Sequence, residues 1–274
     1  MVIIEPKPNL QFADDVDIIE NLQIPENLSY NEKKEAEFLR SIGKGVMLVT
    51  GNPGSGKDLF ATSIAYMNKY YFGRRILLDF LPKEAFGEYT LFNMVVMMRE
   101  INKMAKAAKT EGATQEETDK LVVKASEKFI EENEILFKGS VLYLSELKRY
   151  CYNRNSQSAV NKFIGSLCTV WRHLDILIIG THVQKHEIDQ YSFLAYVTHW
   201  AKCNWSLVRP NTTDVTITRG AFIGNNAVYD VAAKPIILHV DGGKPRKMLN
   251  GKRFFDLYPT KNMVNLKPAI GRDL

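Results

Sequence analysis

The sequence is poor in the residues that build metal centres. Its 274 residues include only three cysteines and five histidines. Cys151, Cys168 and Cys203 lack the spacing of zinc ligands, and the histidines form no ligand cluster with them. A small, odd number of cysteines is typical of reduced thiols in a cytosolic protein. We therefore predict free thiols and no zinc site.

Long apolar runs are also missing. The first segment, MVIIEPKPNLQFADDVD, has no basic start and no apolar core, so it does not resemble a signal peptide. No apolar run approaches the roughly 20 residues that cross a bilayer. We therefore expect a soluble protein without a transmembrane segment. The net charge of +5 is compatible with nucleic-acid binding, but it argues for such binding only where the charges cluster.

What the sequence does contain is an alternation of buried strands and helices. A helical pattern over about 57–72 follows the expected strand 45–50, and another over 156–171 precedes the expected strand 174–182. Strand, helix, strand is a βαβ unit, which indicates a parallel sheet. The expected buried strands are GVMLVT (45–50), RRILLDF (74–80), SVLYLSE (140–146) and LDILIIGTH (174–182).

Additions surround this α/β core, which we place at residues 45–200. An extension (1–44) precedes it and contains a helical stretch over 31–41. Residues 92–137 contain two helical stretches separated by the break TEGAT, and we interpret them as an α-helical insertion. Thr114 followed by Glu117 is the pattern of a capping box at the start of the second helix. This insertion is either a packed helical hairpin or a contact for DNA or a partner. Turn signals between short alternating segments predict a β-rich C-terminal part, 201–274.

The segment GNPGSGK (51–57) fits the phosphate-loop pattern G-x-x-x-x-G-K in full. It follows a buried strand and opens an amphipathic helix, as the motif requires. Glycines let backbone N–H groups surround phosphates, and the helix N-terminus and Lys57 add positive charge. The pattern therefore predicts an ATP site. The expected binding residues are Gly51, Asn52, Pro53, Gly54, Ser55, Gly56, Lys57, Asp58 and Leu59.

Two positions near the expected Mg²⁺ ion are irregular. Asp58 stands where the loop usually has Ser or Thr, and Ser145 stands where the third strand usually ends in Asp. In sites of this class the two positions face each other across the metal, and both side chains offer hard oxygen ligands. Either Asp58 and Ser145 have exchanged roles and share the ion, or the two departures are independent and the site binds weakly or does not hydrolyse. Glu146 follows as the expected group that polarises the attacking water.

Two further residues are candidates for catalysis. His182 ends the fourth strand, where a polar side chain can sense the γ-phosphate; it is equally well explained as a capped strand end. Arg172 precedes that strand, where an exposed arginine can stabilise the transition state in a neighbouring subunit. A surface salt bridge is the alternative for Arg172.

The order of these motifs resembles the Zot-like ATPases, a group that includes the filamentous-phage assembly (gene I) proteins. They belong to the FtsK/HerA branch of P-loop motors, with the packaging ATPases of tailless, membrane-containing viruses. The resemblance covers about residues 45–200, and KRFFDLYPTK is similar to the ending of such domains. It makes Lys57 the phosphate lysine and Glu146 the catalytic glutamate. It also places His182 at a sensor position and Arg172 near a trans-acting arginine.

The resemblance implies Mg²⁺-dependent ATP hydrolysis by a homo-oligomeric ring that moves viral DNA. Capsid or assembly proteins would be further partners, in the host cytoplasm or in association with the virion. Zot-type proteins carry a membrane helix after the ATPase domain, and this sequence offers none. We therefore expect a soluble, virus-type motor. One alternative is an ATP-binding switch or scaffold with little turnover. Another is a small-molecule kinase, which needs an arginine-rich lid over the phosphates; the insertion contains only one arginine, Arg99, and so makes a poor lid.

Two basic stretches are candidates for DNA contact, because a translocating ring needs basic and aromatic groups in its pore. KRYCYNRN follows Glu146 directly and supplies Lys148, Arg149 and Arg154 together with two tyrosines. KPRKMLNGKR (244–253) carries five positive charges. Solvated surface charge is the alternative for both stretches.

Overall fold

The structure is a computed structural model that describes residues 22–108, 114–155, 158–205, 212–223, 226–229, 236–241 and 248–250. KRFFDLYPTK and most of KPRKMLNGKR lie outside the described residues. The elements, in chain order, are α1 (Tyr30–Ile42), β1 (Gly45–Thr50), α2 (Lys57–Phe72), β2 (Ile76–Leu78), η1 (Glu84–Phe86), β3 (Thr90–Leu91), α3 (Met94–Ala107), α4 (Gln115–Glu132), α5 (Glu134–Phe137), β4 (Val141–Leu144), η2 (Leu147–Arg149), η3 (Asn153–Asn155), α6 (Ala159–Thr169), β5 (Leu177–His182), η4 (Lys185–Glu187), η5 (Leu194–Tyr196), β6 (His199–Trp205), β7 (Thr212–Ile223), β8 (Asn226–Tyr229), β9 (Ile236–Asp241) and β10 (Met248–Asn250).

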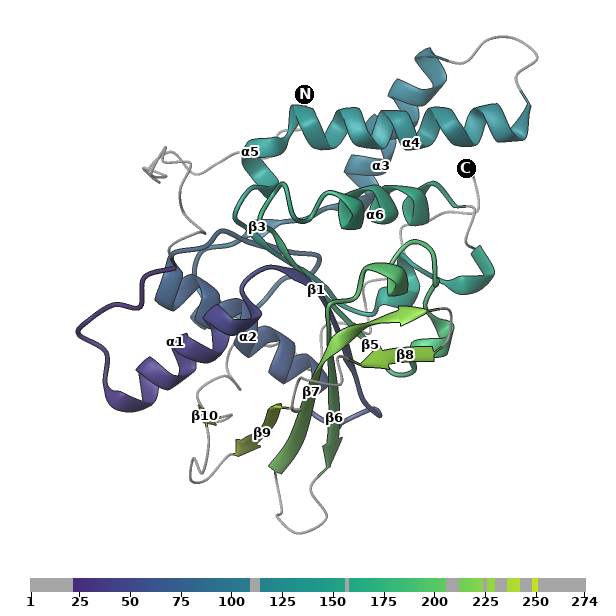
Figure 1. Ribbon diagram of the computed structural model, residues 1–274. Helices are drawn as coiled ribbons and strands as arrows, with labels where there is room; N and C mark the ends of the chain where they lie inside the picture. Colours follow the sequence, from purple (N-terminus) through teal and green to yellow (C-terminus); the bar gives the residue numbers. More distant parts are fainter. Residues whose placement is uncertain are drawn as a thin grey trace.

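One sheet runs through the middle of the molecule (Figure 1). Its described strands have the order β10-β9-β7-β6-β1-β5-β4-β2-β3, and β8 pairs with β7. From β6 to β3 every neighbouring pair is parallel, whereas β7 is antiparallel to both β6 and β9. The predicted α/β fold with a mainly parallel central sheet is confirmed.

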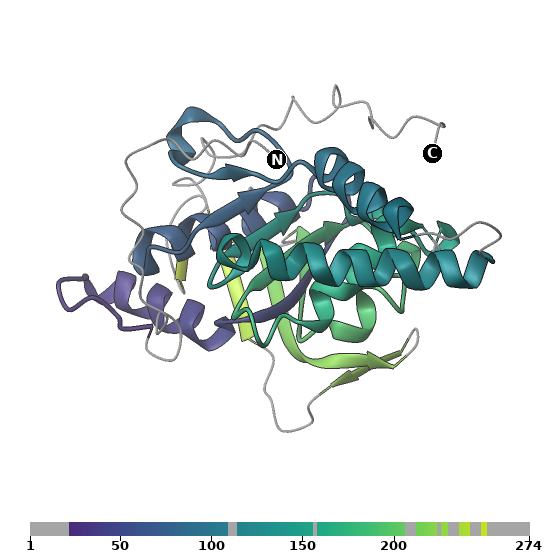
Figure 2. The same cartoon turned by 90° about the horizontal axis from the view of Figure 1, so that it is seen from above.

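Helices cover both faces of the sheet (Figures 1 and 2). Along β1, Met47 and Val49 pack into the core under α1 and α2, while Val46 and Leu48 pack into the core under α3, α4 and α6. This alternation follows from the two-residue period of a strand. Because both faces are buried, β1, β4 and β5 consist of continuously buried residues, which explains their unbroken apolar runs.

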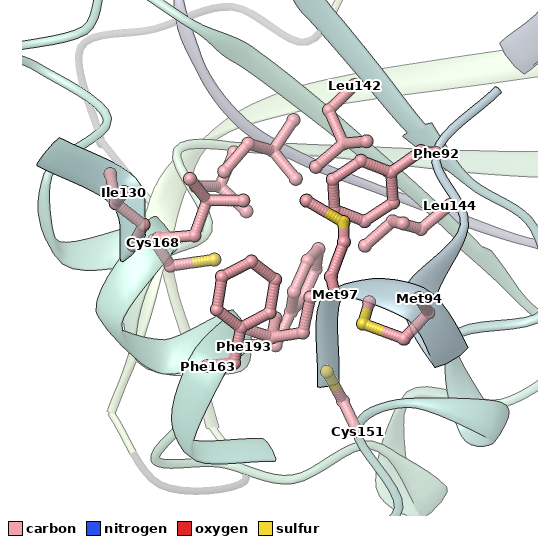
Figure 3. Close-up of a cluster of buried hydrophobic side chains, with 14 of the residues drawn as sticks. Phe92, Met94, Met97, Ile130, Leu142, Leu144, Cys151, Phe163, Cys168 and Phe193 are labelled. Atoms are coloured by element: carbon pink, nitrogen blue, oxygen red, sulfur yellow. The ribbon is translucent and has the colours of Figure 1, made fainter. Parts of the chain in front are cut away.

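The helices α3 and α4 of the expected insertion form part of the layer over one face. The capping box is present: the Thr114 hydroxyl accepts the N–H of Glu117 at 3.2 Å, and the Glu117 carboxylate accepts the N–H of Thr114 at 2.7 Å. Asp119 of α4 forms a 2.5 Å ion pair with Lys162 of α6. The clustered methionines of α3, among them Met94 and Met97, lie in the core (Figure 3). Their burial fits the packed alternative for this hairpin.

The structure shortens one of the predicted strands. The second strand was expected over 74–80, but β2 covers only Ile76–Leu78: the Arg74 side chain before it binds backbone carbonyls, and the Asp79 side chain after it binds Ser145. The division at residue 200 remains a prediction. β6 runs across that residue and pairs in parallel with β1, so the sheet is continuous there. Among the described helices, none is both long and apolar enough to cross a membrane.

Candidate active site

The loop between β1 and α2 is shaped by close backbone approach. Gly56 stands at the N-cap of α2 with φ 82°, a left-handed conformation that favours glycine. A Cβ on Gly56 would lie 2.4 Å from Oγ1 of Thr213, and one on Gly51 would lie 2.6 Å from the carbonyl oxygen of Cys203. Cys203 of β6 and Thr213 of β7 therefore pack directly against the loop. Sequence reasoning had not connected either residue with the phosphate site.

The start of α2 offers donors for an anion. No side chain caps the helix, so its first N–H groups are open to phosphate oxygens. Ser55 and Lys57 of the loop are buried. The Ser55 hydroxyl has no hydrogen-bond partner among the described residues. The loop thus has the donors that the sequence motif predicts.

Two carboxylates flank the amine of Lys57. Its Nζ lies 2.6 Å from Oδ2 of Asp58 and 3.6 Å from Oε1 of Glu146. The other oxygen of Asp58, Oδ1, is buried and has no hydrogen-bond partner within the described part of the chain. A buried carboxylate oxygen without a donor suits a hard cation, so Asp58 fits an Mg²⁺ ion.

Ser145 has a partner that the sequence reasoning missed. Its N–H lies 3.0 and 2.9 Å from the two carboxylate oxygens of Asp79, and its hydroxyl donates to Oδ2 at 3.1 Å. Among the described residues no hydrogen bond joins Ser145 to Asp58. The proposed exchange between these two therefore remains a prediction, with Asp79 as a third oxygen donor beside it. The sequence could have identified Asp79 in the same way as Ser145, because each is a polar residue that directly follows an apolar strand.

Glu146 stands on a left-handed turn at the end of β4, with φ 54° and ψ 64°. Its N–H donates to Oγ1 of Thr181 at 3.3 Å. The contact with His182 lowers the pKa of Glu146, and the charges of Lys57 and Arg149 act in the same direction, while burial opposes them. Glu146 is therefore ionised at neutral pH and able to accept a proton.

His182 lies between two glutamates. Its Nδ1 is 3.6 Å from Oε2 of Glu146, and its Nε2 is 2.7 Å from Oε2 of Glu187. The other oxygen of Glu187 binds Nζ of Lys148 at 2.8 Å. These contacts with Lys148 and His182 lower the pKa of Glu187 to about 2. Glu187 thus connects His182, the expected sensor, to Lys148, one of the expected DNA contacts. Sequence reasoning had not identified Glu187 as a site residue.

The remaining candidates lie farther from the loop. Arg154 is exposed, and Arg149 is partly buried next to Asp79. Arg172 is exposed and packs 5.1 Å from the ring centroid of Trp171. It precedes β5 at the amino edge of the parallel strands, whereas the phosphate loop follows the carboxyl end of β1. Arg172 is therefore not brought to the site of its own chain, and its action on a neighbouring subunit remains a prediction.

The strand order β6-β1-β5-β4-β2, with a glycine loop between β1 and α2, decides the fold. It is that of a P-loop NTPase. No protein-family model matches the chain, and no curated protein matches it.

Solved structures do match. The N-terminal domain of zonular occludens toxin from Neisseria meningitidis is 16% identical, with 79% of this chain and 99% of that chain covered and a TM-score of 0.46. The DNA-packaging ATPase B204 from Sulfolobus Turreted Icosahedral Virus is 10% identical, with 70% and 96% covered and a TM-score of 0.40. B204 from Sulfolobus turreted icosahedral virus 2, in complex with AMPPCP, is 10% identical, with 72% and 97% covered and a TM-score of 0.41. Likeness at this level of identity extends to the fold alone.

Proposed function

We propose that this protein is a Mg²⁺-dependent ATPase that moves DNA during genome packaging or virion assembly of a phage or virus. The observation that carries the proposal is the position of Glu146. Its ionised carboxylate lies 3.6 Å from Nζ of the phosphate-loop Lys57, where a general base for an attacking water is needed. The order of the sequence motifs, which resembles that of Zot-like ATPases, supports the assignment to a DNA motor.

In this proposal each residue of the site has a separate task. The N–H groups of the loop and Lys57 bind the phosphates, and Glu146 takes a proton from water. His182 lies on the other side of the Glu146 carboxylate, with Nδ1 3.6 Å from Oε2. Asp58, with the hydroxyl of Ser145, would hold Mg²⁺, which neutralises charge on the phosphates when bound.

The role of Asp58 is testable by nucleotide binding alone. The variant Asp58→Asn should lose most of the gain in ATP affinity that Mg²⁺ provides, because the negative charge is gone and a neutral amide oxygen binds the ion more weakly. Its affinity without Mg²⁺ should stay equal or rise, since a negative charge beside the phosphates has been removed. Titration of a fluorescent ATP analogue with and without Mg²⁺ measures both quantities. An unchanged gain from Mg²⁺ contradicts the assignment of Asp58 to the metal.

Turnover separates a motor from a switch. Steady-state ATPase activity should be stimulated by single- or double-stranded DNA and be lost in Glu146→Gln, while this variant still binds ATP. ATP binding without turnover, in the presence of either DNA, would instead establish a switch or scaffold.

The segment after Glu146 is proposed to contact DNA, because it ties basic groups to the catalytic strand. Lys148 lies 5.0 Å from the ring centroid of Tyr152. Replacing Lys148, Arg149 and Arg154 by alanine should weaken DNA binding and flatten its salt dependence. The matched control replaces three exposed lysines of α4 by alanine and removes the same charge: Lys120, Lys124 and Lys128. If the two triple variants lose DNA affinity equally, the segment after Glu146 makes no specific contact with DNA.

We also propose that the active form is a homo-oligomeric ring in which Arg172 acts in trans. Arg172→Ala and Lys57→Ala should each be inactive. A mixture of the two variants should recover activity, because a Lys57→Ala subunit can lend its arginine to a neighbour with an intact loop. A mixture as inactive as its components would exclude this role.

A further inference from the structure

Asp79 is the first residue after β2, and its carboxylate reaches across to the end of the neighbouring strand. β2 and β4 pair in parallel with Leu78 opposite Tyr143. The N–H of Asp79 donates to the carbonyl of Tyr143 at 3.4 Å, while its carboxylate accepts both the N–H and the hydroxyl of Ser145. The two strand ends are thereby joined in both directions, directly beside Glu146.

The same carboxylate holds the segment after Glu146. The hydroxyl of Tyr150, which follows η2, donates a hydrogen bond to Asp79. Burial raises the pKa of Asp79 to about 6, although the N–H of Ser145, the Tyr150 hydroxyl and the Ser145 hydroxyl all favour its charged form. Burial and the neighbouring Asp79 raise the pKa of Tyr150 as well. Asp79 is thus an enclosed carboxylate with donors from both sides of the turn that carries Glu146.

That turn needs such support. A left-handed conformation at a residue other than glycine costs roughly 1–2 kcal/mol, and glutamate has no special preference for it. In this chain the backbone is fixed on both sides: Asp79 accepts the N–H of Ser145, and Thr181 accepts the N–H of Glu146. With φ at 54° the side chain of Glu146 points between Lys57 and His182. If the turn relaxed to negative φ, the carboxylate would leave this position.

We infer that Asp79 is a positioning residue of the hydrolytic site, whose carboxylate fixes Ser145 and thereby the left-handed turn that directs Glu146 at the attacking water. The inference rests on the proposed function, because it assumes that Glu146 is the base. It also accounts for the serine at the end of β4. Ser145 donates two hydrogen bonds to the carboxylate that follows β2, from its N–H and from its hydroxyl, and so connects β2 to the turn.

The test separates positioning from simple support of the fold. In Asp79→Ala, kcat should fall about 100-fold, since displacing a catalytic group by about 1 Å costs this much, whereas the dissociation constant of ATP should change less than about twofold. Asp79→Asn keeps an oxygen that accepts the N–H of Ser145, so it should recover about tenfold of that loss. Ser145→Ala keeps the N–H bond to Asp79 but removes the hydroxyl proposed to bind Mg²⁺, so its loss of kcat should shrink at high Mg²⁺ concentration, whereas that of Asp79→Ala should not.

The matched control is Asp175→Ala. Asp175 also has positive φ, 50°, and its carboxylate forms an ion pair with Lys44, but it lies at the amino edge of the sheet, before β5. This variant should lose stability in urea without losing kcat. If Asp79→Ala and Asp175→Ala lower kcat equally at equal folded fraction, or if Asp79→Asn recovers none of the loss in Asp79→Ala, the inference is overturned while the ATPase proposal stands. A wild-type protein without turnover, or an active Glu146→Gln, overturns the proposed function and this inference with it.

Discussion

The guanidinium of Arg74 should be one of the strongest single contributors to the stability of this fold. Arg74 precedes β2 and is 3% exposed. Burial lowers its pKa to about 10, with Asp175 opposing the effect, so it stays charged at neutral pH. All three of its nitrogens donate, mostly to backbone carbonyls just before β1, β4 and β5. The acceptors are the carbonyls of Gly139 (2.8 Å), Gly43 (2.6 Å), Ser140 (2.8 Å) and Asp175 (3.0 Å), and Oδ1 of Asn68 (3.1 Å).

Arg74→Met removes these donors and leaves four carbonyls without them; the contact with Ser140 is buried and the other three are partly buried. Leaving a buried acceptor without its donor costs about 1–3 kcal/mol, so the loss of donors to these carbonyls should cost several kcal/mol in total. Against a typical total of roughly 5–15 kcal/mol, the free energy of unfolding should fall by a third or more. Urea denaturation followed by circular dichroism measures this difference. Arg74→Lys should recover only part of the loss, because an ammonium group cannot reproduce the planar fork of donors.

The control for this prediction is Arg172→Met. Arg172 is exposed, so its replacement should change the free energy of unfolding by less than about 0.5 kcal/mol. If Arg74→Met also stays within about 1 kcal/mol of the wild type, the four carbonyls find other partners and the reasoning is wrong.

Three further outcomes follow from the structure. Gly165→Ala should stabilise the protein by about 0.5–1 kcal/mol in urea denaturation, because α6 gains a better helix former and the new Cβ comes no closer than 3.5 Å to its neighbours; a loss of stability would contradict this. Gly51→Ala should abolish binding of a fluorescent ATP analogue while the protein stays folded, because the Cβ would lie 2.6 Å from the carbonyl of Cys203; normal affinity would show that the loop can shift. Burial raises the pKa of the thiols of Cys151, Cys168 and Cys203, so at pH 8 Ellman's reagent should react with them only after denaturation, and rapid reaction of the native protein would refute their burial.

The local features of the fold were predictable. β1, β4 and β5 are short apolar runs buried on both faces, so the letters of each segment alone mark them as strands. The capping box of Thr114 and Glu117 is equally local, because its partners are three residues apart. The phosphate loop was placed for the same reason, between an apolar strand and the amphipathic helix that starts at Lys57.

The composition of the site depended on contacts between distant segments. Asp79 and Ser145 are 66 residues apart, and they meet because β2 and β4 are neighbours in the sheet. Glu187 joins His182 to Lys148 through a short helix that has no sequence signal. The methionines of α3, which left two interpretations open, proved to be core residues once α4 and α6 were packed against them.

The sequence by itself determined the chemistry available at the carboxyl edge of the sheet: a glycine loop, a lysine, a carboxylate in place of a hydroxyl, and a serine before a glutamate. Periodicity and motif spacing are properties of residues close together in the sequence, so they can be recognised without knowing which segments pack against each other. Only the tertiary structure decided which oxygen binds which donor. It paired Asp58 with Lys57 and Ser145 with Asp79, and it turned Glu146 towards the loop. Lys57 and Asp58 are neighbours along the chain, but strand order decides the contacts of Ser145 and Glu146, because it brings side chains together whatever their separation in the sequence.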